Sequence, residues 1–398
     1  MPAAVSSITA LLSSVLVLIA GNGLINTLVP LRAKLEGFPD LAIGLLGSGY
    51  FAGMLAGTLA APALIARAGY IRAFSAFVAG AVVVSLVYPM AVQPAVWVGL
   101  RYAIGFLFSG FYAVIEAWLS DKSSDADRGR VYALYQVVSY GATAAGQEIL
   151  AFVDPRSAAL FSVTAGLFAL AMLPMAFTQA EPPPKPRTVS LRLPWLWATA
   201  PVAAVASFAI GCANGSFWAL VPVYGLSLGL DAGRVAGFIT AVIVGTALAL
   251  YPVGRLSDRA DRRIVLIGFA GVGALAEVAL ALGSALPYGM VCALGFAVGT
   301  TTMVLYTLAV SHANDRAGPL HAVTVSSGML FLYCAGAILA PVLASVLMAR
   351  FGSTALFWQN GATHAALAVF ALWRVGVRRR GTALRRTPTL GEIEPGRG

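Results

Sequence analysis

Apolar residues run along this chain in long stretches, which are separated by short clusters of charged residues, proline and glycine. An α-helix needs about 20 apolar residues to cross the hydrocarbon layer of a membrane, and charged or Pro/Gly clusters commonly mark its ends. The pattern predicts an all-α integral membrane protein with twelve membrane-spanning helices. Their approximate ranges are 8–30, 42–66, 71–92, 95–119, 131–153, 157–178, 197–226, 235–256, 264–285, 288–311, 321–349 and 354–376.

A polar, proline-rich segment at 181–187 (EPPPKPR) separates the sixth predicted span from the seventh. This composition favours extended chain that forms no core of its own. We therefore predict an N-terminal six-helix half at 1–180, a cytoplasmic linker at 181–196 and a C-terminal six-helix half at 197–376, followed by a basic cytoplasmic tail at 377–398.

The first and seventh predicted spans repeat one another. Residues 21–31 (GNGLINTLVPL) return 192 positions later as 213–223 (ANGSFWALVPV), with five of the eleven positions identical. Arg67 in RAGYIR and Arg259 in RADRR are separated by the same 192 positions. Two copies of one helical unit, side by side in a membrane, are typical of transporters.

Composition agrees with this interpretation. Hydrophobic residues make up 59% of the chain and charged residues 11%, whereas a soluble protein has about a quarter of its residues charged. The first apolar run has no basic region before it and no clear cleavage site, so we expect a retained span and not a signal peptide. The three cysteines lack paired or metal-ligand spacing and are interpreted as core residues, and we expect no metal or cofactor: Cys212, Cys292 and Cys334.

Basic residues predict the orientation. With both termini in the cytoplasm, 20 of the 26 Lys and Arg residues fall in cytoplasmic segments and five fall outside, while Arg101 lies within a span. Cytoplasmic loops carry such an excess, so we expect a multi-pass protein of the bacterial inner membrane with both ends inside. The net charge of +10 is then explained by contact with anionic membrane lipids and needs no nucleic-acid partner.

The loop between the eighth and ninth predicted spans, GRLSDRADRR at 254–263, resembles the loop signature of the major facilitator superfamily. That signature reads Gly-x-Leu-x-Asp-Arg-x-Gly-Arg-Arg, and Asp261 stands where glycine is usual. The carboxylate of Asp258 can face a helix N-terminus, and the arginines can bridge to neighbouring carboxylates. We interpret the loop as a conformational latch formed by Gly254, Arg255, Asp258, Arg259, Arg262 and Arg263.

The first half carries a degraded copy of this loop, PALIARAGYI at 62–71, with Ala66 in place of the aspartate. We assign Arg67 and Arg72 to the latch. Glu116, near the inner end of its span, is interpreted as a latch partner in preference to a substrate ligand. Other candidate partners of Arg72 are Asp121, Asp125 and Asp127.

Further segments, at 67–74, 116–120, 127–130 and 312–315, resemble the YcaD-type bacterial transporters of this superfamily, over a similarity that extends from about residue 10 to 375. The resemblance implies two pseudo-symmetric halves, with spans one, four, seven and ten around a central cavity. Asn22 and Asn26 share one helical face, although such amides also serve as packing contacts between helices. The candidate cavity residues are Asn22, Asn26, Tyr112, Tyr140, Gln147, Asn214, Trp218 and Tyr306.

Charged residues inside spans are costly and commonly functional. Arg101 and Glu148 both fall roughly 7–9 Å below the outer surface, at 1.5 Å rise per residue. We interpret them as an outer gate or proton-coupling pair, with a static ion pair as the alternative. Glu277, in a span that is normally peripheral, is expected to be buried against another helix, and His364 to be structural.

The chain has no phosphate-binding Gly-x-x-x-x-Gly-Lys-Ser/Thr loop and no nucleophile–base pair, so we expect neither ATP drive nor an enzyme. The fifth span lacks the proline of the proton-antiporter signature, which weakens an exporter assignment. We predict a monomeric secondary active transporter of a small organic solute, working by alternating access and coupled to protons, with export slightly favoured. The alternatives are a lipid or lysolipid flippase and a membrane sensor that transports nothing.

Overall fold

The computed structural model describes residues 2–123, 127–176, 183–184, 191–283 and 286–384, and these contain helices and no strand. The N-terminal half consists of α1 (Pro2–Leu35), α2 (Asp40–Ala68), α3 (Tyr70–Val87), α4 (Pro94–Lys122), α5 (Arg128–Glu148) and α6 (Ala159–Ala176), with a 3-10 turn η1 (Ile149–Ala151) after α5. The C-terminal half consists of α8 (Pro201–Ser227), α9 (Ala232–Arg259), α10 (Arg262–Leu282), α11 (Tyr288–Thr301), α12 (Leu305–Ala317), α13 (Ala322–Phe351) and α14 (Ala355–Leu384). A short helix α7 (Leu193–Thr199) precedes α8, and a 3-10 turn η2 (Pro319–His321) precedes α13.

The all-helical membrane fold with twelve spans is confirmed, and α11 and α12 together form one of these spans. By length and composition, ten of the described helical stretches could cross a membrane on their own. The other two spans are α5 and α14, which are more polar because they carry side chains such as Gln147, Glu148, Asn360 and His364. These side chains make hydrogen bonds inside the protein, as polar groups within a membrane must.

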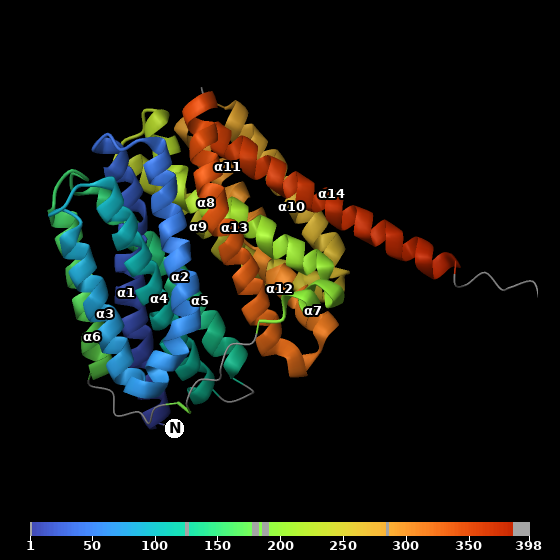
Figure 1. Cartoon of the computed structure of the whole chain (residues 1–398), viewed down its shortest axis with the longest axis horizontal. Helices are drawn as coiled ribbons and strands as arrows, with labels where there is room; N and C mark the ends of the chain where they lie inside the picture. Colours follow the sequence, from blue (N-terminus) through green and yellow to red (C-terminus); the bar gives the residue numbers. More distant parts are fainter. Residues whose placement is uncertain (1, 124–126, 177–182, 185–190, 284–285, 385–398) are drawn as a thin grey trace, which may run out of the picture.

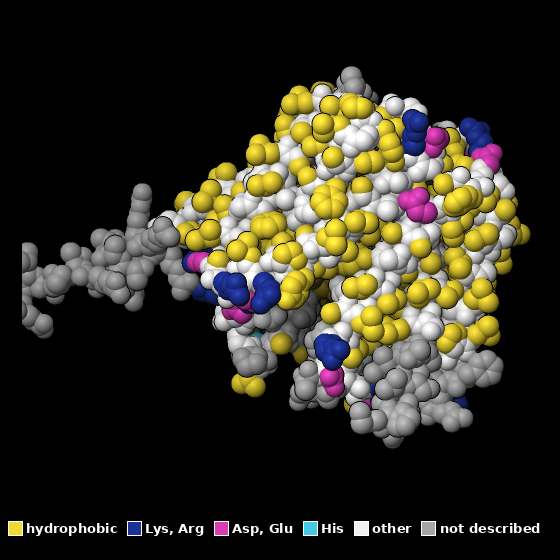
Figure 2. Space-filling view, turned by 180° about the vertical axis from the view of Figure 1, so that it is seen from behind, with side chains coloured by type: hydrophobic (Ala, Val, Ile, Leu, Met, Phe, Trp, Pro, Cys, Tyr) yellow, Lys and Arg dark blue, Asp and Glu magenta, His cyan; other side chains and the backbone are white. Residues whose placement is uncertain are grey.

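The two halves stand side by side, with α1–α6 in blue to green and α8–α14 in yellow to red (Figure 1). They touch where α2 packs on α13, where α5 packs on α9, and where α1 and α2 pack on α8. We call the end at which α2 begins the upper end and the end at which α2 stops the lower end, as in Figure 1. Apolar side chains cover the middle of the outer surface, and charged ones lie mostly near the two ends (Figure 2).

The tenth span differs from the sequence prediction of one helix at 288–311, because it is broken between α11 and α12. Three successive threonines lie at the break: Thr300 and Thr301 end α11, and Thr302 follows it. The hydroxyls of Thr300 and Thr301 donate to the carbonyl of Ala297 at 2.9 and 2.6 Å, and Thr302 donates to Val298 at 2.9 Å. Hydroxyls that bond back to the preceding turn bend helices, so this cluster accounts for the break.

A buried polar pair joins α10 to α14. The carboxylate of Glu277 lies 2.8 Å from Nδ1 of His364, and the two side chains are 2% and 0% exposed. On the same face of α14, Asn360 donates to the carbonyl of Ala213 in α8 at 3.2 Å. Glu277 is thus buried against another helix, away from the cavity described below, and the pair ties the outermost helices of the C-terminal half together.

We expect Glu277→Ala to lower the unfolding free energy by on the order of 3 kcal/mol, because it leaves His364 buried without its hydrogen-bond partner. Thermal unfolding of the detergent-purified protein measures the effect. The double variant Glu277→Leu/His364→Phe removes both polar groups and should be more stable than Glu277→Ala. A melting temperature of Glu277→Ala equal to that of the wild type would contradict a structural role for the pair.

Candidate functional site

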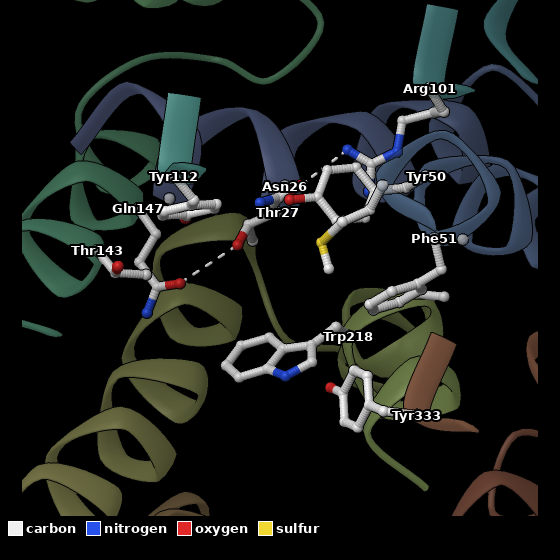
Figure 3. A pocket seen from close by; sticks show the side chains of 14 residues that line it. Asn26, Thr27, Tyr50, Phe51, Arg101, Tyr112, Thr143, Gln147, Trp218 and Tyr333 are labelled. Atoms are coloured by element: carbon white, nitrogen blue, oxygen red, sulfur yellow. Dashed lines mark hydrogen bonds between the residues drawn. The ribbon is translucent and has the colours of Figure 1, made fainter. Parts of the chain in front are cut away.

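A cavity of about 240 Å³ lies between the two halves, roughly midway along α1, α2 and α8 (Figure 3). One wall comes from α1, α2, α4 and α5, and the other from α8 and α13. The lining residues are Gly23, Asn26, Thr27, Gly47, Tyr50, Phe51, Met54, Arg101, Tyr112, Thr143, Gln147, Trp218, Ala219 and Tyr333.

A buried cation marks one side of the cavity. Arg101 is 4% exposed, and its Nη1 donates to Oδ1 of Asn26 at 2.8 Å. Nδ2 of Asn26 in turn donates to Oδ1 of Asn22 at 3.0 Å, which fixes the orientation of the Asn26 amide. The guanidinium carbon lies 4.7 Å from the centre of the Tyr50 ring, a cation–π distance. The two asparagines on one face of α1 therefore position a positive charge.

Aromatic side chains form much of the remaining wall. Phe51 of α2 and Tyr333 of α13 approach to 6.1 Å between ring centres across the two halves, and Trp218 of α8 lies beside them (Figure 3). Tyr306 of α12 packs edge-on against Tyr333 at 5.1 Å. A cavity of this lining suits a ligand with an apolar or aromatic body and a few polar groups.

A chain of hydrogen bonds leads from the cavity to the contact between α5 and α9. Thr27 donates to Oε1 of Gln147 at 3.3 Å, and Nε2 of Gln147 donates to Oγ1 of Thr240 at 2.9 Å. The Thr240 hydroxyl then donates to the carboxylate of Glu148 at 2.5 Å. Because Thr240 belongs to the C-terminal half and the others to the N-terminal half, the chain ties the two halves together.

Close packing closes the upper end of the cavity. The hydroxyl of Ser48 in α2 donates to the carbonyl of Ile338 in α13 at 2.6 Å. A Cβ on Gly44 would lie 2.5 Å from Oγ of Ser345, and one on Gly47 would collide with the side chain of Ala219. Small residues allow helices in membranes to approach this closely. At the lower end, by contrast, Figure 2 shows a hollow between the halves.

The expected ion pair between Arg101 and Glu148 is not formed in this structure. Arg101 contacts Asn26 and Tyr50 within the N-terminal half, whereas Glu148 accepts its hydrogen bond from Thr240 of the other half. Counting residues along the helices put Arg101 and Glu148 at the same depth in the membrane, which led to the predicted pair. Their side chains, however, extend from α4 and α5 toward different neighbours.

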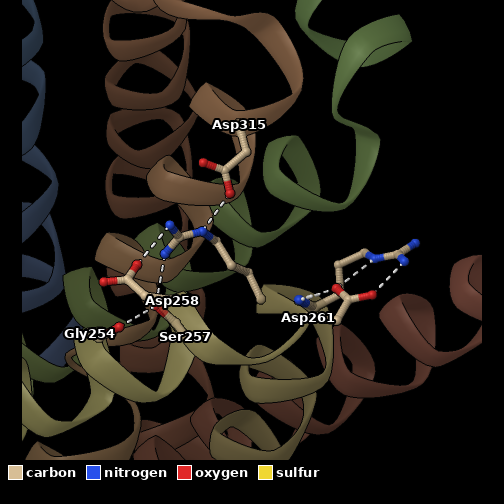
Figure 4. Close-up of polar contacts among 7 residues, drawn as sticks. Gly254, Ser257, Asp258, Asp261 and Asp315 are labelled. Atoms are coloured by element: carbon tan, nitrogen blue, oxygen red, sulfur yellow. Dashed lines mark hydrogen bonds and ion pairs between the residues drawn. The ribbon is translucent and has the colours of Figure 1, made fainter.

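The latch loop forms a clasp within the C-terminal half (Figure 4). Arg262, at the start of α10, lies 2.9 Å from Asp258 at the end of α9 and 2.6 Å from Asp315 at the end of α12. Asp261 caps α10 by accepting from the backbone N–H of Arg263 at 3.0 Å. The Arg263 side chain also donates to Asp261 and holds the pKa of that carboxyl below its usual value. An aspartate at this position thus acts as a helix cap.

The N-terminal members of the predicted latch do not join this clasp. Arg67 and Arg72 are exposed, and neither forms an ion pair with a described residue. Glu116 lies within electrostatic range of Tyr112 on its own helix and of Tyr306 in the other half. Glu116 forms no ion pair with a described residue, so its role as a latch partner stays a prediction.

The cavity residues proposed from sequence divide into three groups. Four line the cavity, namely Asn26, Tyr112, Gln147 and Trp218. Asn22 supports Asn26 from behind, and Tyr306 supports Tyr333. Tyr140 and Asn214 are outside the lining. The pattern gave no signal for Tyr50, Phe51, Met54 and Tyr333, because they stand in α2 and α13, which are apolar on every face. The lining residues Thr27 and Thr143 were also missed.

The remaining latch residues are at the surface. Arg255 donates to the Tyr251 hydroxyl at 3.1 Å, one turn away on α9, and Arg259 is exposed at the end of that helix. Gly254 has no heavy atom of a neighbouring element within 4 Å of a Cβ position. Gly254 therefore makes no close helix contact in this conformation.

Two packed six-helix halves around a shared polar and aromatic cavity define this protein as a membrane transporter. The sequence model of the Major Facilitator Superfamily matches residues 11–318 and 203–391, and the chain belongs to that family.

Its relatives are bacterial transporters. A Yersinia pestis protein described as an uncharacterized MFS-type transporter is 28% identical over 349 residues, which cover 87% of this chain and 90% of that protein. The uncharacterized MFS-type transporter YcaD of Escherichia fergusonii is 27% identical over 354 residues, with the same coverage. The nucleoside transporter NupG has the same fold, with a TM-score of 0.75 at 12% identity over 94% of this chain and 98% of that chain.

We expect Asp258→Asn to change the melting temperature little, because the Asp258 side chain is 66% exposed and Arg262 keeps Asp315 as a partner. Exposed ion pairs contribute about 0–1 kcal/mol. The double variant Asp258→Asn/Asp315→Asn leaves Arg262 without a carboxylate and should be the least stable of the three proteins. Thermal unfolding of both single variants and the double variant measures this. A large loss in Asp258→Asn alone would show that Asp315 does not share the clasp.

Proposed function

We propose that this protein is a secondary active transporter that moves a small organic solute by alternating access. The observation that carries the proposal is a cavity lined by both halves, with close helix packing at the upper end of the molecule and a hollow between the halves at the lower end. A rocking motion that opened the upper contacts and closed the lower hollow would expose the same cavity to the other side. The cavity volume suits a small organic molecule better than a lipid.

The distribution of basic residues supports a cytoplasmic lower end. The clasp around Arg262 lies at this end, where α9 stops and α10 begins, and positively charged loops face the cytoplasm. The conformation described here is then open toward the cytoplasm. On this proposal the chain works as a monomer in the bacterial inner membrane with both termini inside.

Glu148 is our candidate for proton coupling. Its carboxylate accepts a hydrogen bond from Thr240 across the two halves, and Tyr288 of α11 also lies within its electrostatic range. A hydrogen bond to an ionised acceptor is stronger than one to a neutral acceptor. Protonation of Glu148 would weaken the upper closure, and the hydrogen-bond chain through Gln147 would pass that change to the cavity.

The upper closure can be tested by Gly47→Leu, which we expect to shift the protein toward the state that is open at the upper end. Spin labels at Leu41 and Arg350 report the upper ends of α2 and α13, and labels at Leu64 and Val323 report the lower ends; all four side chains are exposed. Pulsed EPR should show a longer upper distance and a shorter lower distance. The matched control is Gly99→Leu, since a Cβ on Gly99 meets no atom within 4 Å. Unchanged distances in Gly47→Leu would count against alternating access at this interface.

We expect acidification to lengthen the upper distance between the labels at Leu41 and Arg350 in the wild type, and Glu148→Gln to remove most of this pH dependence. A hydrogen bond to a charged group contributes about 1.5–3 kcal/mol and a neutral one about 0.5–1.5 kcal/mol, so protonation should change the populations about five- to tenfold. Glu36→Gln is the matched control, because Glu36 pairs with Arg32 away from the interface between the halves. The same pH profile in Glu148→Gln and wild type would remove Glu148 from the coupling mechanism.

A further inference from the structure

We propose that the cargo carries an anionic group, in the class of small carboxylates with an aromatic or apolar body, and that Arg101 binds this group inside the cavity. The inference rests on the proposed transport function and names the substrate class of the same site.

Arg101 lacks a counter-ion. It lies in the interior of α4 and is 4% exposed, and among the described residues no carboxylate lies within ion-pair distance of it. A buried charge of this kind is costly unless it is paired. A protein that keeps such a charge on a cavity wall gains a binding site for an anion.

The guanidinium group retains donors for a ligand. It presents five N–H donors in one plane, of which Nη1 is used by Asn26, and Nε has no hydrogen-bond partner. Tyr50 lies against the group at 4.7 Å. This planar fork matches the two oxygens of a carboxylate.

Resident acidic groups near the upper end are matched with other partners. Glu36 pairs with Arg32 at 2.6 Å, and Asp40 pairs with Lys34 at 2.6 Å. Glu148 is held by Thr240. The charge of Arg101 is therefore left for a molecule that enters the cavity.

The aromatic and apolar side chains of the lining determine the rest of the cargo. Trp218, Phe51 and Tyr333 face the cavity from α8, α2 and α13 (Figure 3), and Met54 adds a flexible apolar side chain. Such a wall favours an aromatic or apolar body. An anionic head at Arg101 and an apolar body against these side chains fill the site together.

The test compares acids with their neutral amides on the purified full-length protein. The probes are benzoate and benzamide, phenylacetate and phenylacetamide, and indole-3-acetate and indole-3-acetamide, with affinities measured by calorimetry. We expect the wild type to bind the acids at least about tenfold more tightly than the amides. Arg101→Gln should remove this preference, and Arg101→Lys should retain part of it. Arg350→Gln, the same change at an exposed site, should behave as the wild type.

A second variant keeps the test valid if Arg101→Gln fails to fold. Asn26→Asp is nearly isosteric and places a carboxylate at the atom that now lies 2.8 Å from Nη1 of Arg101. This internal anion should raise the melting temperature of the ligand-free protein and weaken acid binding at least about tenfold.

Three outcomes would overturn the anion assignment: acids and amides that bind the wild type equally, no binding of any acid, or acid binding that is unchanged in both Arg101→Gln and Asn26→Asp. These outcomes leave alternating access standing if Gly47→Leu still changes the EPR distances. Wild-type distances in Gly47→Leu would instead count against transport, whatever the acids do.

Discussion

Polar groups inside a membrane must find partners within the protein, because lipid offers none. This constraint organises the structure. Within one half it produces fixed contacts, such as the pair of Glu277 and His364 in the C-terminal half and the amide of Asn22 that orients Asn26 in the N-terminal half. Between the halves it produces hydrogen bonds such as those of Ser48 and Gln147. Arg101 is one of the exceptions among the described residues, since its charge is only partly satisfied by the protein.

The interface between the halves combines few hydrogen bonds with close helix packing. Ser48 and Gln147 bond across it, and Gly44 and Gly47 allow α2 to lie directly on its neighbours. Surfaces of small residues separate without exposing large apolar side chains to a new environment, and their few hydrogen bonds can be exchanged for bonds to water. The ion pairs of Arg262, in contrast, stay within one half. On the proposed mechanism they would brace the C-terminal half as it rocks, and the glycine and hydroxyl contacts would hold the two halves together at the upper end.

Sequence patterns predicted the spans and the two halves, because apolar length and the internal repeat depend only on position along the chain. They also placed Asn22 and Asn26 on one face, since helical spacing fixes that relation. The sequence of a uniformly apolar helix does not indicate which of its faces points into a cavity. Tyr50, Phe51 and Tyr333 were therefore missed as lining residues. The pairing of Arg101 with Glu148 failed for the same reason: depth follows from residue counting, but the direction of a side chain does not.

An anionic cargo would also influence the direction of transport. Moving one negative charge out of a cell with an inside-negative potential of 100 mV is favourable by about 2.3 kcal/mol. Exchange of an outgoing monovalent anion for one incoming proton moves two charges in the favourable sense, about 4.6 kcal/mol on the same basis. Uptake of the anion with one proton moves no net charge and gains nothing from the potential. If the cargo is the proposed anion, the membrane potential alone would therefore favour its export by exchange for a proton over its uptake together with one proton.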